Sequence, residues 1–304
     1  MRLTVVGVAS LAFATLSTAQ ESIAPGAATA PDTAARDDRA AEQLGWRLGV
    51  QAWTFRDRTA FEAIDTARAL GLKYIELYPG QPLAREHGDA KVAVDMTTAH
   101  LDALRAKLDA TDVRAMGFGV VGFGTNEAEA RKTFAFAEAM GIGTITCEPD
   151  ADAWDLVEKL ADEYRIDIAC HDHPKPSRYW DPQTVLTAAK DRSQRLGACA
   201  DTGHWSRSGL ETVASLNLLA GRIRSLHFKD IAPATAKGED KPWGTGEGKA
   251  REMLAELHRQ GFRGLVSIEY ETGRGPELEA NVARCIAFFD AEARALVARG
   301  EPGK

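Results

Sequence analysis

Short apolar runs alternate with segments of helical periodicity between residues 48 and 297, and this alternation constrains the fold more than any other feature. The predicted strands cover residues 48–55, 73–77, 113–119, 144–148, 167–171, 197–201, 223–228 and 265–269. The predicted helices cover residues 58–70, 97–109, 127–140, 153–164, 182–189, 210–219, 249–260 and 278–297. Short junctions between alternating strands and helices favour parallel strands with crossover helices, and eight units close a barrel. We therefore predict a single-domain α/β protein, a (β/α)8 TIM barrel, over residues 44–298.

The distribution of glycine supports the barrel over a doubly wound open sheet. The junctions 69–73, 139–143 and 259–264 place a glycine just past a predicted helix, where a left-handed cap precedes the next strand. An open sheet that binds nucleotides has a glycine-rich turn after its first strand, whereas residues 51–58 contain no glycine. The dense glycine segment 243–248 is interpreted either as a flexible loop or as a lid whose amides approach an oxygen-rich ligand.

The two ends of the chain are predicted to lie outside the barrel. Met1-Arg2, an apolar run over residues 3–16 and small residues at 17–19 form a predicted signal peptide, 1–19. The apolar run is short for a spanning helix, which needs about 20 residues, so we expect no membrane segment after cleavage. Residues 20–43 have the composition of a disordered linker, and residues 299–304 form a C-terminal tail. The protein is therefore expected to be exported and periplasmic or secreted.

The charge of the chain argues against a nucleic-acid partner. The formal net charge is −7, and no stripe of Lys and Arg with interleaved aromatics is present, so nucleic acid is not expected as a partner.

The cysteines leave the redox state open, because an exported chain can form disulfides. Cys147, Cys170 and Cys199, however, each lie near the end of a predicted strand, and we expect them to be buried free thiols packed against the helices.

Four predicted strands end in residues that can bind a metal. These residues are Glu148, Asp201, His227 and Glu269. In a (β/α)8 barrel the C-terminal ends of the strands form the active-site face. Three carboxylates within about 4 Å of one point repel by roughly 4 kcal/mol per pair at an effective dielectric near 20, so they need a cation or raised pKa values. Oxygen-rich ligation with one imidazole suits Mn²⁺ best, with Mg²⁺, Co²⁺ and Zn²⁺ left open.

Other polar and aromatic residues are expected at the same mouth. His171 and His173 follow the fifth predicted strand, and either is expected to contact substrate or a metal. Lys229 could bind an anion or a substrate oxygen, or be a solvated lysine. Trp53 ends the first strand and, with Trp205 and Trp243, could form an apolar wall against a sugar face.

At this point the chain resembles the sugar isomerase and epimerase superfamily with the xylose-isomerase-like barrel. The resemblance covers residues 48–295 and rests on Tyr74-Ile75-Glu76-Leu77, Cys147-Glu148-Pro149, Ala200-Asp201-Thr202-Gly203-His204, Ser225-Leu226-His227-Phe228-Lys229-Asp230 and Ser267-Ile268-Glu269-Tyr270. It implies that Glu148, Asp201, His227 and Glu269 bind a divalent metal. It also implies that Glu148 and Glu269 lie on opposite faces of a sugar, where one removes a proton beside a carbonyl and the other returns it. His204 is similar to a substrate-contacting histidine of related epimerases, and Glu76 is assigned to substrate binding.

Three functions remain open at this stage. The first is a metal-dependent sugar isomerase or epimerase, or a lyase or hydratase of 3-keto-glycosides that uses the same enolate chemistry. The second is a metal-dependent hydrolase, and the third is a sugar-binding barrel without catalysis. Export and the lack of a phosphate-binding motif favour an unphosphorylated small carbohydrate as the substrate. Barrels of this superfamily commonly associate, which leaves a homo-oligomer open, and no segment identifies an interface.

Overall fold

Eight parallel strands close into a barrel in the computed structural model, which describes Met1 and residues 36–300. Around the barrel the strands follow the order β1-β10-β7-β6-β5-β4-β3-β2. Their bounds are β1 (Trp46–Gln51), β2 (Tyr74–Leu77), β3 (Arg114–Phe123), β4 (Thr144–Pro149), β5 (Asp167–His171), β6 (Leu196–Asp201), β7 (Ile223–Phe228) and β10 (Gly264–Ile268). The predicted (β/α)8 TIM barrel is therefore confirmed.

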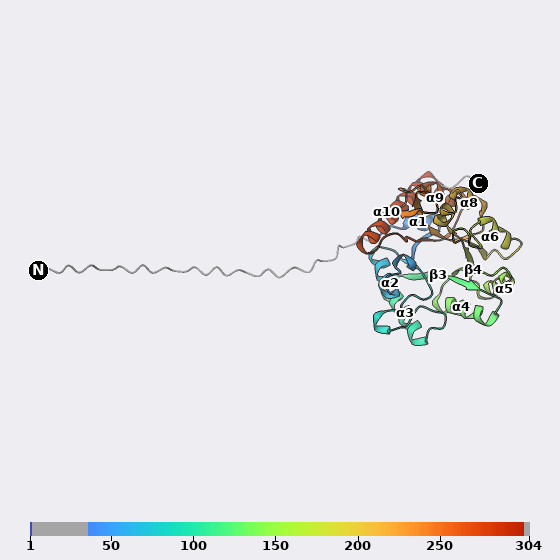
Figure 1. The fold of residues 1–304 in the computed structure, drawn as a ribbon, viewed down its shortest axis with the longest axis horizontal. Coiled ribbons are helices and arrows are strands. Elements are labelled where there is room, and N and C mark those ends of the chain that lie inside the picture. The colour runs from blue at the N-terminus through green and yellow to red at the C-terminus, as the bar shows by residue number, and fades with distance from the viewer. Residues whose placement is uncertain (2–35, 301–304) are drawn as a thin grey trace. The chain divides into compact units, whose positions relative to one another are not determined.

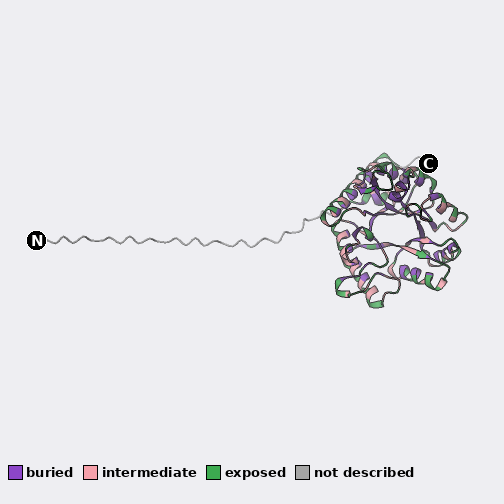
Figure 2. Cartoon of the chain, in the orientation of Figure 1, coloured by how far each residue is buried: buried purple, intermediate pink, exposed green. Residues whose placement is uncertain are grey.

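Helices surround the strands on the outside of the barrel (Figure 1). Their bounds are α1 (Arg39–Leu44), α2 (Ala60–Ala69), α3 (Thr98–Thr111), α4 (Glu127–Met140), α5 (Trp154–Tyr164), α6 (Pro182–Ala188), α7 (Thr202–Arg207), α8 (Thr212–Leu218), α9 (Ala250–Arg259) and α10 (Gly275–Arg299). Two short 3-10 helices, η1 (Ala52–Phe55) and η2 (Arg85–His87), and a hairpin of β8 (Asp230–Ala232) and β9 (Glu239–Lys241) complete the described part. Buried residues concentrate on the strands and on the inner sides of the helices (Figure 2). No helix among the described residues has the length and apolar content needed to cross a bilayer.

Local signals set the ends of the helices. The Thr59 hydroxyl accepts from the backbone N–H of Glu62, whose side chain accepts in return from the N–H of Thr59, so α2 begins with a capping box. The predicted junction glycines Gly71, Gly141 and Gly261 all have positive φ, at 77°, 68° and 66°. This conformation turns the chain from a helix into the next buried strand, and glycine adopts it without steric cost.

The predicted linker is wrong at its C-terminal end. Arg39–Leu44 forms helix α1, which packs against α10. Arg36 extends this attachment through two hydrogen bonds to the buried Asp290 carboxylate, at 2.8 and 2.6 Å. A six-residue helix spans under two turns, so its periodicity is too short to detect in sequence. The predicted signal peptide, residues 20–35 of the linker and residues 301–304 of the tail lie outside the described residues, apart from Met1.

All four cysteines are free and buried, which confirms the prediction of buried free thiols for Cys147, Cys170 and Cys199. Cys147 and Cys170 belong to the hydrophobic core, as expected for side chains that face the helices. Cys199 differs, because it lies two residues before Asp201 and therefore shares its side of the strand. Its thiol lies near the imidazole of His227 and is one of the groups that raise the pKa of that residue, which burial alone would lower.

Three backbone amides of the glycine-rich segment converge on a single carboxylate. Asp230 accepts hydrogen bonds from the backbone amides of Gly244, Gly246 and Gly248, at 2.8, 3.0 and 2.9 Å. A Cβ atom on Gly246 would lie 2.4 Å from an Asp230 oxygen, so this position needs a glycine. These three amides are therefore directed at Asp230, and the lid interpretation in which they approach a ligand is wrong.

Candidate active site

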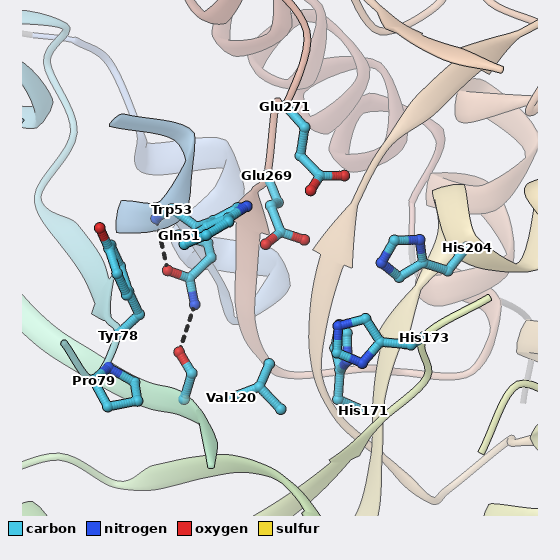
Figure 3. Close-up of a pocket in the computed structure, with 11 residues that line it drawn as sticks. Gln51, Trp53, Tyr78, Pro79, Val120, His171, His173, His204, Glu269 and Glu271 are labelled. Atoms are coloured by element: carbon cyan, nitrogen blue, oxygen red, sulfur yellow. Dashed lines mark hydrogen bonds between the residues drawn. The ribbon is translucent and has the colours of Figure 1, made fainter. Parts of the chain in front are cut away.

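A cavity of about 370 Å³ opens among residues most of which lie at or just beyond the C-terminal ends of the strands. Its lining residues are Gln51, Trp53, Tyr78, Pro79, Gly119, Val120, His171, His173, His204, Glu269 and Glu271. Figure 3 shows Trp53, Tyr78 and Pro79 on one side of the cavity and His171, His173 and His204 on the other. We call His171, His173, His204, Glu269 and Glu271 the titratable wall, and Trp53, Tyr78, Pro79 and Val120 the apolar wall.

Four buried side chains converge on one point, and two of them belong to the titratable wall. His171, Asp201, His227 and Glu269 each offer one ligand atom, and these atoms lie within 4.8 Å of one another. They come from the ends of β5, β6, β7 and β10, because parallel strands deliver their last side chains to the same face of a barrel. We call these four residues the buried cluster. Three of them are predicted metal ligands, and the fourth is His171.

Several atoms of this cluster have no hydrogen-bond partner. His171 Nε2 and His227 Nδ1 are fully buried and unpaired among the described residues. Glu269 Oε2 also makes no well-directed hydrogen bond, although Lys229 Nζ is 2.7 Å away and His227 Nδ1 is 3.2 Å away. A buried polar atom without a hydrogen-bond partner lowers the stability of the folded protein. A bound ion that contacts these atoms would remove this penalty. Two imidazole nitrogens and two carboxylates are donors that a divalent transition metal accepts, and the buried cluster therefore fits a metal ion.

Glu148 lies in a second group with His171 and His173. Its Oε1 atom contacts Nδ1 of His173 and lies 3.4 Å from Nδ1 of His171. Burial would raise the pKa of Glu148, but hydrogen bonds from the two histidines outweigh it and lower this pKa to about 2. These three residues could also hold a metal. Glu148 does not line the cavity, whereas its neighbour His173 does.

His171 connects the two groups through its two ring nitrogens. Nδ1 faces Glu148, and Nε2 lies 3.5 Å from Asp201 Oδ2. Burial alone would lower the pKa of His171, but its interactions with Asp201 and Glu148 raise it to about 10. A neutral His171 with its proton on Nδ1 would donate to Glu148 and present the Nε2 lone pair to a metal.

Lys229 is fully buried and bound to three carboxylates. Its Nζ atom lies 2.9 Å from Asp201 Oδ2, 2.7 Å from Glu269 Oε2 and 2.9 Å from Glu271 Oε2. Burial opposes its charge, but these carboxylates raise the pKa of Lys229 well above its usual value. The ammonium donates hydrogen bonds to Asp201 and Glu271 and forms an ion pair with Glu269, which argues against both a solvated lysine and an anion-binding one.

Glu76 lies inside the barrel, below the cavity. It is fully buried and bound to Thr146, Ser267 and His227, which come from three other strands. Burial would raise the pKa of Glu76, but His227, Thr146 and Ser267 lower it overall. Glu76 does not line the cavity. The structure thus separates it from the substrate-binding position expected from sequence.

The remaining predicted residues divide between the cavity and the core. His204 lines the cavity with Nε2 3.4 Å from Asp201 Oδ2, and burial lowers its pKa well below the usual value. Trp53 is 39% exposed and meets Tyr78 edge-on, with ring centroids 5.2 Å apart. Trp205 and Trp243 are buried in the core, so they do not extend the apolar wall.

Sequence reasoning missed several residues of the cavity, and some of them carried a detectable signal. Tyr78 lies two residues after Glu76, and Glu271 lies two residues after Glu269. Tyr78 and Glu271 lie just past the ends of β2 and β10, at the face where site residues are expected, so both could have been found. Gln51 and Val120 lie on strands without a distinctive pattern, and only the fold reveals them.

Comparison with known proteins identifies the family. The xylose isomerase-like TIM barrel pattern matches residues 64–291, and the chain belongs to that family. A comparison with curated protein sequences gives no match.

Three solved structures illustrate the similarity. An uncharacterised protein from Parabacteroides distasonis ATCC 8503 is 32% identical, with a TM-score of 0.67 over 81% of this chain and 99% of that one. A D-tagatose 3-epimerase-like protein is 14% identical, with a TM-score of 0.64 over 83% and 99% of the two chains. The IOLI protein, whose structure includes a bound zinc atom, is 18% identical, with a TM-score of 0.60 over 83% and 98%. With sequence identities of 14% and 18%, the last two structures show a similar fold and nothing further.

Proposed function

We propose that this protein is a divalent-metal-dependent enzyme of the isomerase and epimerase type, acting on an unphosphorylated sugar or keto-sugar. The reaction would begin with removal of a proton from the carbon beside a carbonyl. One observation carries this proposal: Glu269 belongs to the buried cluster and also lines the cavity. The same carboxylate thus lies beside the candidate metal ligands and within reach of a molecule in the cavity.

His171, Asp201, His227 and Glu269 would hold the cation, with Mn²⁺ the first candidate and Mg²⁺, Co²⁺ or Zn²⁺ as alternatives. A bound divalent cation would supply Lewis-acid polarisation of the carbonyl. The name of the zinc-containing IOLI structure and the chemistry of the donor atoms both support a metal at this position.

Two glutamates would move the proton. Glu269 lies at the wall and would exchange a proton directly with the sugar. Glu148 contacts His171 and His173, and only His173 of this pair is substantially exposed, with 49% of its side chain accessible. Glu148 would therefore act together with His173 as the second group that exchanges a proton with the substrate. A positioned acid or base of this kind contributes about 10² to 10⁴ in rate.

The charge of the cavity supports an unphosphorylated substrate. Among the described residues that line it there are two glutamates and three histidines, but no lysine or arginine. Lys229, a buried cation that does not line the cavity, is bound to three carboxylates. A phosphate group would meet unfavourable potential there, whereas a neutral sugar would not. A volume of about 370 Å³ falls within the usual range for small-ligand sites.

The fate of the enolate decides between three related reactions. Return of the proton on the other face gives epimerisation, and transfer to the neighbouring carbon gives isomerisation. Loss of a group from that neighbouring carbon gives elimination, as in a lyase or hydratase of 3-keto-glycosides. The name of the D-tagatose 3-epimerase-like structure favours epimerisation as the first reaction to test.

Proton exchange in D₂O tests the proposal. The Mn²⁺-treated protein is incubated with unphosphorylated ketoses and 3-keto-glycosides, the metal is removed, and NMR follows the carbon-bound protons. We expect deuterium beside the carbonyl of at least one compound, with the product distinguishing epimerisation from elimination. Absence of exchange across the panel, with metal demonstrably bound, would contradict the proposal and favour hydrolysis or binding alone.

We also propose export to the periplasm or the medium, supported by the pattern of residues 1–19. N-terminal sequencing of the protein recovered from cell fractions tests this. A chain that retains Met1 in the cytoplasmic fraction would contradict it.

A further inference from the structure

We propose that Glu76 is a positioning residue that holds the His227 imidazole with its proton on Nε2, so that the Nδ1 lone pair faces the buried cluster. This inference rests on the metal site of the proposed function. It gives Glu76 a role distinct from substrate binding.

The hydrogen bonds of Glu76 determine which nitrogen of His227 carries the proton. Glu76 Oε1 accepts from the Thr146 hydroxyl at 2.6 Å, and Oε2 accepts from the Ser267 hydroxyl at 2.9 Å. His227 Nε2 lies 3.0 Å from the same Oε2 atom. An ionised carboxylate only accepts hydrogen bonds, so Nε2 must donate one. The second ring nitrogen then carries a lone pair when the imidazole is neutral.

That second nitrogen points into the buried cluster. His227 Nδ1 is fully buried, has no hydrogen-bond partner among the described residues, and lies 3.2 Å from Glu269 Oε2. A lone pair and a carboxylate oxygen at this distance repel unless a cation or a proton lies between them. Histidine ligands of metals commonly donate their other N–H to a carboxylate, which fixes the ring and increases its basicity. Glu76 and His227 have the geometry of such a pair.

The barrel is shaped to accommodate the Glu76 side chain. Glu76 is on β2, whereas Thr146, His227 and Ser267 are on β4, β7 and β10, so its carboxylate reaches across the interior. Gly117 on β3 is the register neighbour of Glu76. A Cβ atom at position 117 would lie 2.9 Å from Glu76 Cγ and 3.1 Å from Cδ. Glycine at this position therefore leaves the space that the glutamate occupies.

The tautomer can be measured without any substitution. The full chain, labelled with ¹⁵N-histidine and loaded with diamagnetic Zn²⁺, is examined by long-range ¹H–¹⁵N NMR. We expect the His227 proton on Nε2 and a metal-shifted Nδ1 resonance. A proton on Nδ1 in the Zn²⁺-loaded protein would overturn the inference, whether or not the enzyme is active.

Variants test the energetic consequence through Zn²⁺ and Mn²⁺ affinity, measured by competition with a chelating dye. Glu76→Gln should weaken binding by about 10- to 100-fold, since the neutral amide no longer enforces the proton position. Ser267→Ala removes one donor to Glu76 and should weaken binding about two- to fivefold. Ser225→Ala is the matched control, because Ser225 is on the same strand as His227 and its buried hydroxyl has no hydrogen-bond partner among the described residues. It should leave the affinity unchanged.

The outcomes separate this inference from the proposed function. If the unmodified protein binds neither metal, the metal site itself fails. If it binds metal and folded Glu76→Gln binds equally well, only the role of Glu76 is overturned. Should Glu76→Gln fail to fold, Ser267→Ala and the tautomer of the unmodified protein decide the question.

Discussion

The two walls of the cavity face each other but are built in different ways. On the titratable wall, His171 is 2% exposed and His204 is 8% exposed, and both lie next to the buried Asp201. On the apolar wall, Trp53 is 39% exposed and makes an edge contact with Tyr78. One wall is therefore held by buried charges, and the other presents accessible aromatic surface (Figure 3).

This difference suggests that the titratable wall carries out the chemistry and that the apolar wall binds the substrate. Proton transfer needs groups held at fixed distances, and the carboxylates that supply them must be desolvated and compensated. Lys229 provides part of that compensation through its three carboxylate contacts. The apolar wall needs only shape and contact area. Substitutions on the titratable wall should therefore affect rate, metal affinity and stability, whereas substitutions on the apolar wall should affect substrate binding.

The sharpest test is Glu269→Gln on the titratable wall. Loss of the ionisable group should reduce the rate of deuterium exchange by about 10² to 10⁴. Metal content is measured in parallel, so that loss of the base is distinguished from loss of the cation. Glu252→Gln, on the exposed side of α9, is the control and should keep the original rate. A folded, metal-bound Glu269→Gln protein with an unchanged exchange rate would remove Glu269 from the mechanism.

The second test removes the compensating cation. Lys229→Met should destabilise the metal-free protein by about 3–5 kcal/mol, because it leaves buried carboxylates without their partner. Urea unfolding in the presence of EDTA measures this loss, and added Mn²⁺ should recover part of it by binding the native state. Lys159→Met on the surface of α5 should leave the unfolding midpoint nearly unchanged. A loss below about 1 kcal/mol for Lys229→Met would show that these carboxylates need no cation.

The third test uses pH to examine His171. Its pKa is raised to about 10, so the imidazole of the metal-free protein is charged at neutral pH. A metal must displace this proton, and affinity for Mn²⁺ should rise roughly tenfold per pH unit between about pH 6 and 8 for each proton displaced. Titration calorimetry in buffers of different ionisation enthalpy counts the protons released. Affinity independent of pH would exclude His171 as a ligand.

The same raised pKa predicts how the stability of the metal-free protein depends on pH. Because the folded pKa of His171 lies above its ordinary value of 6.5, the folded protein binds the proton more tightly than the unfolded chain does. The contribution is fully present below pH 6.5 and is lost as pH rises through about 10. Chemical unfolding at pH 6 and pH 9 should show this decrease, and His171→Gln should reduce it.

The barrel could be predicted from sequence because each strand and helix repeats a local pattern. The predicted helix 127–140 and strand 223–228 coincide with α4 and β7. Helix α7 was missed, since its six residues follow Asp201 directly and begin with that carboxylate as the cap. The periodicity of apolar residues identifies long helices and strands. It does not identify a helix of six residues whose start is set by a side-chain cap.

The positions of the site residues could be predicted, but not the depth of each side chain. Glu76 and Glu148 both occur near strand ends, yet Glu76 is fully buried in the barrel interior, whereas Glu148 lies outside the buried cluster and contacts His171 and His173. Depth depends on strand stagger and on neighbours from other strands, such as Thr146 and Ser267. These contacts link residues about 70 and 190 positions apart in the chain, which no local pattern records.

The smallest expected effect lies on the apolar wall. Trp53→Ala should raise KM about fivefold without lowering kcat, because roughly 50 Å² of apolar contact contributes about 1 kcal/mol to binding. Stability should change little, since the ring is 39% exposed. Steady-state kinetics on the substrate found by deuterium exchange separate KM from kcat. A fall in kcat with unchanged KM would mean that the apolar wall also positions the reacting carbon, and the division between the two walls would no longer hold.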